Sequence, residues 1–231
     1  PRSTLFPYTT LFRSTLGSNS VAIGGLALSA QNFTTATDSY NVAVGSLAGR
    51  NVTTGVRNTL LGGLSGDALT VGSFNVGVGY DSLAIDTQGS KSTALGYGAL
   101  STQNLTTATD ALNVGVGFSA GNGLTTGSVN TLIGGQAGAN LTTENSNVFV
   151  GFNSGQFNTT GAQNTFLGTR AGQGITGTKL TGNNNVAVGF QAGKVLQGTA
   201  TLNTFVGVDA GVAVTTGVNN TFVGGLAGDA T

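Results

Sequence analysis

Residues 41–45 read Asn-Val-Ala-Val-Gly, and units of this form return along almost the whole chain of 231 residues. Each unit has Asn or Ser first, Val or Thr second, a variable residue third, an aliphatic residue fourth and Gly fifth. The copies begin at Ser20, Asn41, Asn58, Asn75, Ser92, Asn113, Asn130, Asn147, Asn164, Asn185, Asn203 and Asn220. Neighbouring copies start 17, 18 or 21 residues apart, and the 21-residue spacing returns every 72 residues. A fixed period of this length is typical of a repeat architecture.

The unit alternates in the manner of a short β-strand. The second and fourth positions share one strand face, because successive side chains point to opposite sides. Since the fourth position is always aliphatic, we predict that it faces the core, with Val150 as an example. The third position should then point away from the core and form a seam between chains. That seam would carry Leu60, Leu132, Phe149, Phe166, Phe205 and Phe222.

These observations predict an all-β fold, a parallel β-solenoid (β-roll) of about twelve coils of 17–21 residues, assembled as a homotrimer. Stacked coils place like residues in columns, so the opening Asn should form a ladder of side-chain hydrogen bonds. We assign the solenoid to residues 15–231 and expect it to be a fragment of a longer protein. Residues 1–14 share no column with the repeat, and Ser3–Ser14 resembles a translated sequencing adapter, so we expect a non-native segment there.

Composition excludes several classes of function. The chain has no Cys or His, which removes thiol and imidazole chemistry and the usual zinc ligands. Eight basic and eight acidic residues give no basic field for nucleic acid. Gly, Asn and Thr interrupt every apolar run, so we expect no membrane insertion by this segment. We therefore expect no enzymatic activity, no cofactor and no metal.

Three four-residue insertions follow Leu28, Leu100 and Gly172 and account for the 21-residue spacings. Loops on a rigid scaffold commonly carry binding residues. We expect these insertions to protrude as binding loops. Their candidate binding residues are Asn32, Thr34, Asp38, Asn104, Thr106, Asp110 and Lys179.

The motif Asn19-Ser-Val-Ala-Ile-Gly24, with its Asn-Val-Ala-Val-Gly and Asn-Thr-Phe-Val-Gly variants, resembles the head repeat of trimeric autotransporter adhesins. The longer form with Ala-Gly and Thr-Thr-Gly turns is also similar to shaft repeats of phage tail-fibre-like proteins. The resemblance covers residues 19–231 and implies left-handed parallel β-rolls, assembled as trimers, that bind matrix, host-cell or glycan surfaces. It implies an extracellular place, on a cell outer surface or a virion. The coils here are longer than those of the adhesin heads.

Two alternatives use the same solenoid. Recurring Thr-Thr-Gly turns, as at residues 53–55 and 125–127, are compatible with an ice-binding face, although the Thr pairs are interrupted. A polysaccharide-cleaving spike would need paired carboxylates. Only Asp81 and Asp86 are close in sequence, and we expect the acidic residues to be solvated turn residues.

Overall fold

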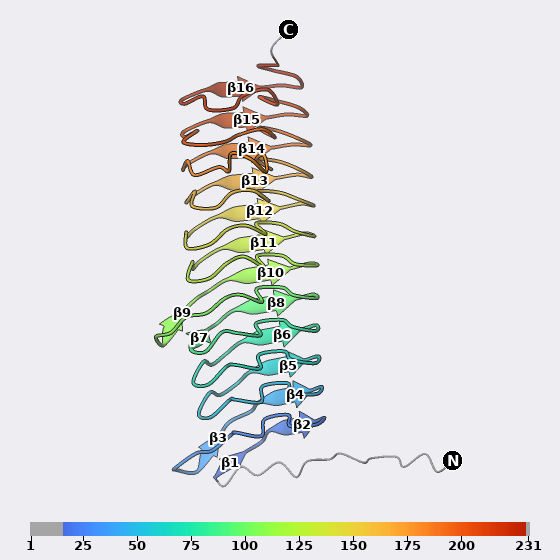
Figure 1. The fold of residues 1–231 in the computed structure, drawn as a ribbon, viewed down its shortest axis with the longest axis vertical. Helices are drawn as coiled ribbons and strands as arrows, with labels where there is room; N and C mark the ends of the chain where they lie inside the picture. Colours follow the sequence, from blue (N-terminus) through green and yellow to red (C-terminus); the bar gives the residue numbers. More distant parts are fainter. Residues whose placement is uncertain (1–15, 230–231) are drawn as a thin grey trace, which may run out of the picture.

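The computed structural model describes residues 16–229 and is a single stack of coils built on one long parallel sheet (Figure 1). Each repeat unit contributes one three-residue strand to this 12-stranded sheet. In chain order the strands are β2 (Val21–Ile23), β4 (Val42–Val44), β5 (Thr59–Leu61), β6 (Val76–Val78), β8 (Thr93–Leu95), β10 (Val114–Val116), β11 (Thr131–Ile133), β12 (Val148–Val150), β13 (Thr165–Leu167), β14 (Val186–Val188), β15 (Thr204–Val206) and β16 (Thr221–Val223). The described residues form strands and turns without a helix, so the parallel β-solenoid prediction is confirmed. Residues 1–14 lie outside the described part of the chain.

Two further pairs of short strands involve the first two insertions, which supply one strand of each pair. β1 (Gly17–Ser18) pairs with β3 (Thr37–Asp38), and β7 (Gly89–Ser90) pairs with β9 (Thr109–Asp110). Both pairs are parallel and join an insertion to the coil before it. Figure 1 shows β3 and β9 projecting on the same side of the stack.

The pairing register places equivalent positions of neighbouring repeat units opposite one another. Ala43 lies opposite Leu60, for example, and Phe149 lies opposite Phe166 with ring centroids 5.0 Å apart. The opening asparagines form the predicted ladder. Asn58 Nδ2 donates to Asn41 Oδ1 at 3.2 Å, and the same contact links Asn130 to Asn113 and Asn203 to Asn185. This part of the sequence prediction is confirmed.

The predicted inside and outside of the strand were wrong. The third position is buried in ten of the twelve strands, with Leu60, Leu132, Phe149, Phe166 and Phe205 all at 0% exposure, and it is half-buried in the two end strands, where Phe222 lies. The second and fourth positions are half-buried or exposed, and Val150 lies on the outer side of β12. The third column is therefore the core and cannot be a seam between chains, and Val150 is no core residue.

The ladder explains why the strand faces this way. Most of these Asn side chains also reach across their own coil, as when Asn41 Nδ2 donates to the Gly55 carbonyl at 2.8 Å and Asn75 Nδ2 to the Gly89 carbonyl at 2.9 Å. The Asn side chain must therefore point inward. Because strand side chains alternate, the third position points inward with the first. Buried amides with satisfied hydrogen bonds fix the orientation more strongly than uniform aliphatic character does.

Large and small residues alternate across the narrow core. The ring of Phe149 lies against Gly155, where φ is +57° and an added Cβ would lie 2.5 Å from Cδ2 of the ring. Gly155 lies six residues after the third position of its strand. Where the third position is Gly77 or Ala94, the residue six positions later is instead Leu83 or Leu100, and both leucines are buried and have positive φ. In these coils one bulky group lies between the strand and the opposite segment, which keeps the core close-packed.

Candidate functional site

The first two insertions share one construction. Each begins with a buried Gln, which is Gln31 or Gln103. Two residues later comes a buried apolar anchor, Phe33 or Leu105. Thr34 and Thr106 follow the anchors and are exposed. A buried anchor before a run of exposed residues lets a loop project without losing its attachment to the core.

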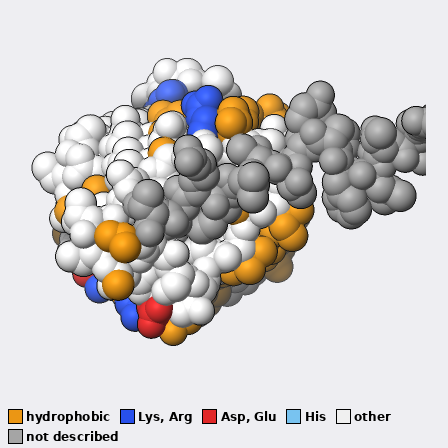
Figure 2. Space-filling view, turned by 90° about the horizontal axis from the view of Figure 1, so that it is seen from below, with side chains coloured by type: hydrophobic (Ala, Val, Ile, Leu, Met, Phe, Trp, Pro, Cys, Tyr) orange, Lys and Arg blue, Asp and Glu red, His pale blue; other side chains and the backbone are white. Residues whose placement is uncertain are grey.

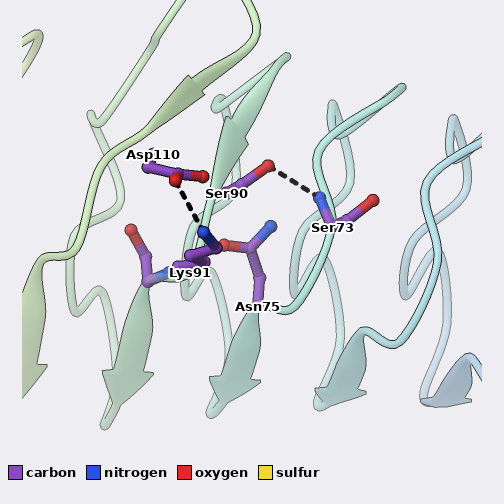
Figure 3. Close-up of polar contacts among 6 residues, drawn as sticks. Ser73, Asn75, Ser90, Lys91 and Asp110 are labelled. Carbon is purple, nitrogen blue, oxygen red and sulfur yellow. Dashed lines mark hydrogen bonds and ion pairs between the residues drawn. The ribbon is translucent and has the colours of Figure 1, made fainter.

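Each of these loops ends on an exposed carboxylate that contacts the preceding coil. Asp38 accepts hydrogen bonds from Ser18 Oγ at 2.6 Å and Asn19 Nδ2 at 2.9 Å. Asp110 forms an ion pair with Lys91, with Nζ 2.6 Å from Oδ2 (Figure 3). Both partners of this pair are about half exposed, so its contribution to stability is small. Its position on the surface leaves both charges accessible to a ligand.

Asn32 is exposed, whereas Asn104 is half-buried and accepts a hydrogen bond from Thr87 Oγ1 at 3.2 Å. The corresponding residues of the two loops therefore do not present the same surface. Figure 3 also shows the Ser73 amide, which donates to Ser90 Oγ at 3.0 Å and so joins the two coils before the second loop. The named residues of these two loops are exposed except Asn104, and their role in binding stays a prediction.

The third insertion is built differently. Residues 175–179 are exposed, Lys179 among them, and Leu180 returns to the core at 0% exposure. Leu180 forms isolated parallel bridges with Asn158 and Gly198 in place of a two-residue strand pair. The three insertions lie four coils apart, about 19 Å at the usual strand spacing. They are three separate loops and do not converge on one site.

Asp86 corrects the expectation that the acidic residues are solvated. It is 1% exposed, and its Oδ1 accepts from the Gly89 and Leu105 amides at 3.0 and 3.1 Å. Its Oδ2 accepts from Gln103 Nε2 at 2.5 Å. Burial raises the pKa of this carboxyl, and the hydrogen bonds from Gln103, Gly89, Leu105 and the Gln88 backbone only partly oppose that shift. Asp86 is a structural cap for the inserted coil, and the half-buried Asp81 is not among its hydrogen-bond partners.

In most of the Thr-Thr turns only the second Thr is exposed at the surface, whereas both Thr215 and Thr216 are exposed. The first Thr donates to the next coil, as when Thr125 Oγ1 donates to the Thr142 carbonyl at 3.1 Å and Thr142 Oγ1 to the Thr159 carbonyl at 3.0 Å. The second Thr is exposed, as at Thr126 and Thr143. Since the first hydroxyls already have partners, these turns form one broken column and no flat two-column array.

The outer side of the 12-stranded sheet is uncharged along its whole length, and its fourth-position column is aliphatic in every strand. We call the second and fourth positions of its strands the outward face. They carry only Val, Thr, Ile and Leu, and Ile23, Leu95, Ile133, Leu167 and Val223 are among the exposed large hydrophobic residues. Seen along the stack, hydrophobic side chains lie at several places around the rim, with the longest run at the lower right, and charged side chains occupy small spots (Figure 2). Such a surface on a single chain marks an interaction site.

A second apolar column was missed from the sequence. The residue after the closing Gly is aromatic in five coils, and all five are exposed. They are Tyr80, Tyr97, Phe118, Phe152 and Phe190, defined here as the aromatic column. Reading the residue after the Gly as part of the repeat would have found them, but the prediction stopped at the glycine.

Among the described residues, no group of three acidic side chains could hold a metal ion, and no helix is long and apolar enough to cross a membrane. Comparison of the chain with protein-family models, curated proteins and solved structures found no match. The fold and the exposed surfaces are therefore the basis for any functional conclusion.

Proposed function

We propose that this chain is a non-enzymatic segment of a surface-exposed fibrous protein, an adhesin head or a tail-fibre shaft, that presents loops for receptor or surface binding. The outward face carries this proposal. It is uncharged over all twelve strands, about 50 Å at the usual strand spacing. Monomeric proteins rarely expose an apolar surface of this length.

We infer that copies of the chain pack against one another along this face as a homotrimer. The threefold number comes from the resemblance to adhesin heads. In this proposal the outward face forms the contact between chains that the sequence had assigned to the third position of the strands, because the third position is buried inside the coils. Its Val and Thr side chains suit a packed β-surface. Parallel packing would repeat each inserted loop three times around the fibre, and repetition strengthens weak contacts through avidity.

Val150→Asp tests the assembly. The side chain lies on the outward face, so the charge should leave the coil folded but enter the interface between chains, where an unpaired charge is costly. Light scattering should give three times the mass of one chain for the wild type and one chain mass for the variant, with the same circular dichroism. Thr160→Asp, on an exposed turn, should keep the wild-type mass. A monomeric wild type at micromolar concentration would contradict the proposal.

Thr34→Lys combined with Thr106→Lys tests the loops. Both side chains are exposed and follow the buried anchors, so the fold should keep its melting temperature. We expect adhesion of the wild type to collagen-coated or epithelial-cell surfaces, and a reduction of at least tenfold in the double variant, since loss of several weak contacts multiplies. Thr160→Lys is the matched control on a regular turn. Full adhesion by the double variant would show that the loops are not the contact.

A further inference from the structure

The aromatic column continues beside the outward face, at the turn that follows each strand, and its five side chains are between 45% and 58% exposed. Single exposed apolar residues are ordinary, but five aromatic rings in one line are not. Aromatic rings are also typical linings of ligand sites, where a few polar groups fix the orientation of the ligand.

The column has two parts with different ring geometry. Tyr80, Tyr97 and Phe118 occupy consecutive coils and stack on one another, with centroids 5.7 and 5.5 Å apart. Further along, Phe118, Phe152 and Phe190 occupy alternate coils, so that neighbouring rings are two strand spacings apart, about 10 Å. This spacing is close to the length of one disaccharide in an extended β-1,4-linked chain.

The coils between these rings carry small residues, Gly135 and Thr169. A Cβ added at Gly135 would lie 3.3 Å from Cδ2 and 3.6 Å from Cε2 of Phe152. The Phe152 ring therefore lies over Gly135, in the space that a side chain there would take. In this part of the column the described rings do not stack on one another, so each ring can contact a ligand separately.

Amide side chains line the same turns. Gln156 Nε2 donates to Gln136 Oε1 at 3.2 Å, and Gln173 Nε2 donates to Gln156 Oε1 at 2.9 Å. This chain leaves Nε2 of Gln136 and Oε1 of Gln173 without a protein hydrogen bond among the described residues. A donor and an acceptor are thus available beside the rings, as sugar hydroxyls require.

The charge of these turns has one sign. Residues 118–122, 135–139, 152–156, 169–173 and 190–194 contain no Asp or Glu, but they contain Arg170 and Lys194. Neither cation takes part in the two ion pairs found among the described residues. Two half-buried cations without a carboxylate partner are complementary to an anionic ligand.

We propose that the turn surface formed by Phe118, Phe152, Phe190, the Gln136–Gln156–Gln173 chain, Arg170 and Lys194 binds a linear β-1,4-linked polysaccharide that carries carboxylates. The rings contact the apolar faces of alternate sugars, the amides bind hydroxyls and the cations pair with carboxylates. This inference rests on the proposed non-enzymatic binding function and names the chemical class of one ligand.

The test is calorimetric titration of the whole chain with β-1,4-linked mannuronate hexasaccharide and with cellohexaose, which has the same linkage without carboxylates. The wild type should bind mannuronate more tightly than cellohexaose. Phe152→Ala should weaken both by at least tenfold, as expected for an aromatic anchor. Arg170→Gln should weaken mannuronate alone. Phe74→Ala is the matched control, since Phe74 is 47% exposed but lies before a strand, where Arg57 covers its ring at 5.3 Å.

Absence of binding to both sugars by the wild type overturns the proposal, as does an equal effect of Phe74→Ala and Phe152→Ala. Light scattering on the same samples distinguishes a role of Phe152 in assembly from a role in sugar binding. A fall in mass for Phe152→Ala with unchanged sugar binding would assign the ring to contacts between chains and would also overturn the site. A wild type that binds mannuronate as a monomer would support this site while contradicting the threefold assembly.

Discussion

Phe149→Ala is expected to lower the free energy of unfolding by about 3–5 kcal/mol, the usual cost of removing a buried aromatic ring. The Phe149 ring is fully buried and stacks on Phe166 at 5.0 Å. Gly138 and Gly155 lie against it and offer no side chain that could fill the cavity. Because a solenoid coil contacts only its neighbours, the core has no second layer to compensate.

Urea unfolding followed by far-ultraviolet circular dichroism measures this effect. Phe152→Ala is the matched control, because it removes the same ring three residues later from a position that is 51% exposed. Its cost should be within about 0.5 kcal/mol, as for most surface substitutions. Equal costs for the two variants would mean that the inside and outside of β12 are not as described.

Asp86→Ala should cost about 3 kcal/mol, although Asp86 has no cationic partner. The substitution leaves two buried backbone amides without an acceptor, and the Gln103 amide keeps only its bond to Ser92 Oγ; each unsatisfied group costs about 1–3 kcal/mol before relaxation. Asp110→Ala is the control, since it removes an exposed ion pair with Lys91 that should contribute less than about 1 kcal/mol. A cost below that of Asp110→Ala would exclude the capping role.

The difference in stability between the wild type and Asp86→Ala should depend on pH. Burial raises the folded-state pKa of Asp86 above its ordinary value of 3.8, so folding favours the protonated carboxyl. The extra stability of this group is fully present below pH 3.8 and is lost as the pH rises through the raised pKa. The difference in unfolding free energy between wild type and Asp86→Ala should therefore fall over that window and stay constant above it. A difference that grows with pH would show that the pKa is lowered instead.

The spacing of the units determined most of the architecture. A 17-residue period with one β-like unit per turn allows few solutions other than stacked coils, since no coil can bury its apolar residues alone. The same reasoning located the asparagine ladder and the three insertions, because each depends only on residues at fixed distances along the chain. The inserted loops contain the exposed residues that the sequence indicated, with Asn104 as the half-buried exception.

The sequence prediction placed the wrong face of the strand inside, and the tertiary structure decided which face is buried. A unit with apolar residues at the second, third and fourth positions is compatible with either face inside. The choice depends on Asn41 and its equivalents, whose amides reach a carbonyl on the far side of their own coil. The burial of Asp86 was hidden for a similar reason, because its partners Gln103 and Leu105 come from the following coil. Contacts across a coil and between coils depend on how the chain closes each turn. The spacing of the units predicts that the turns repeat, but only the folded structure shows which residues each turn brings together.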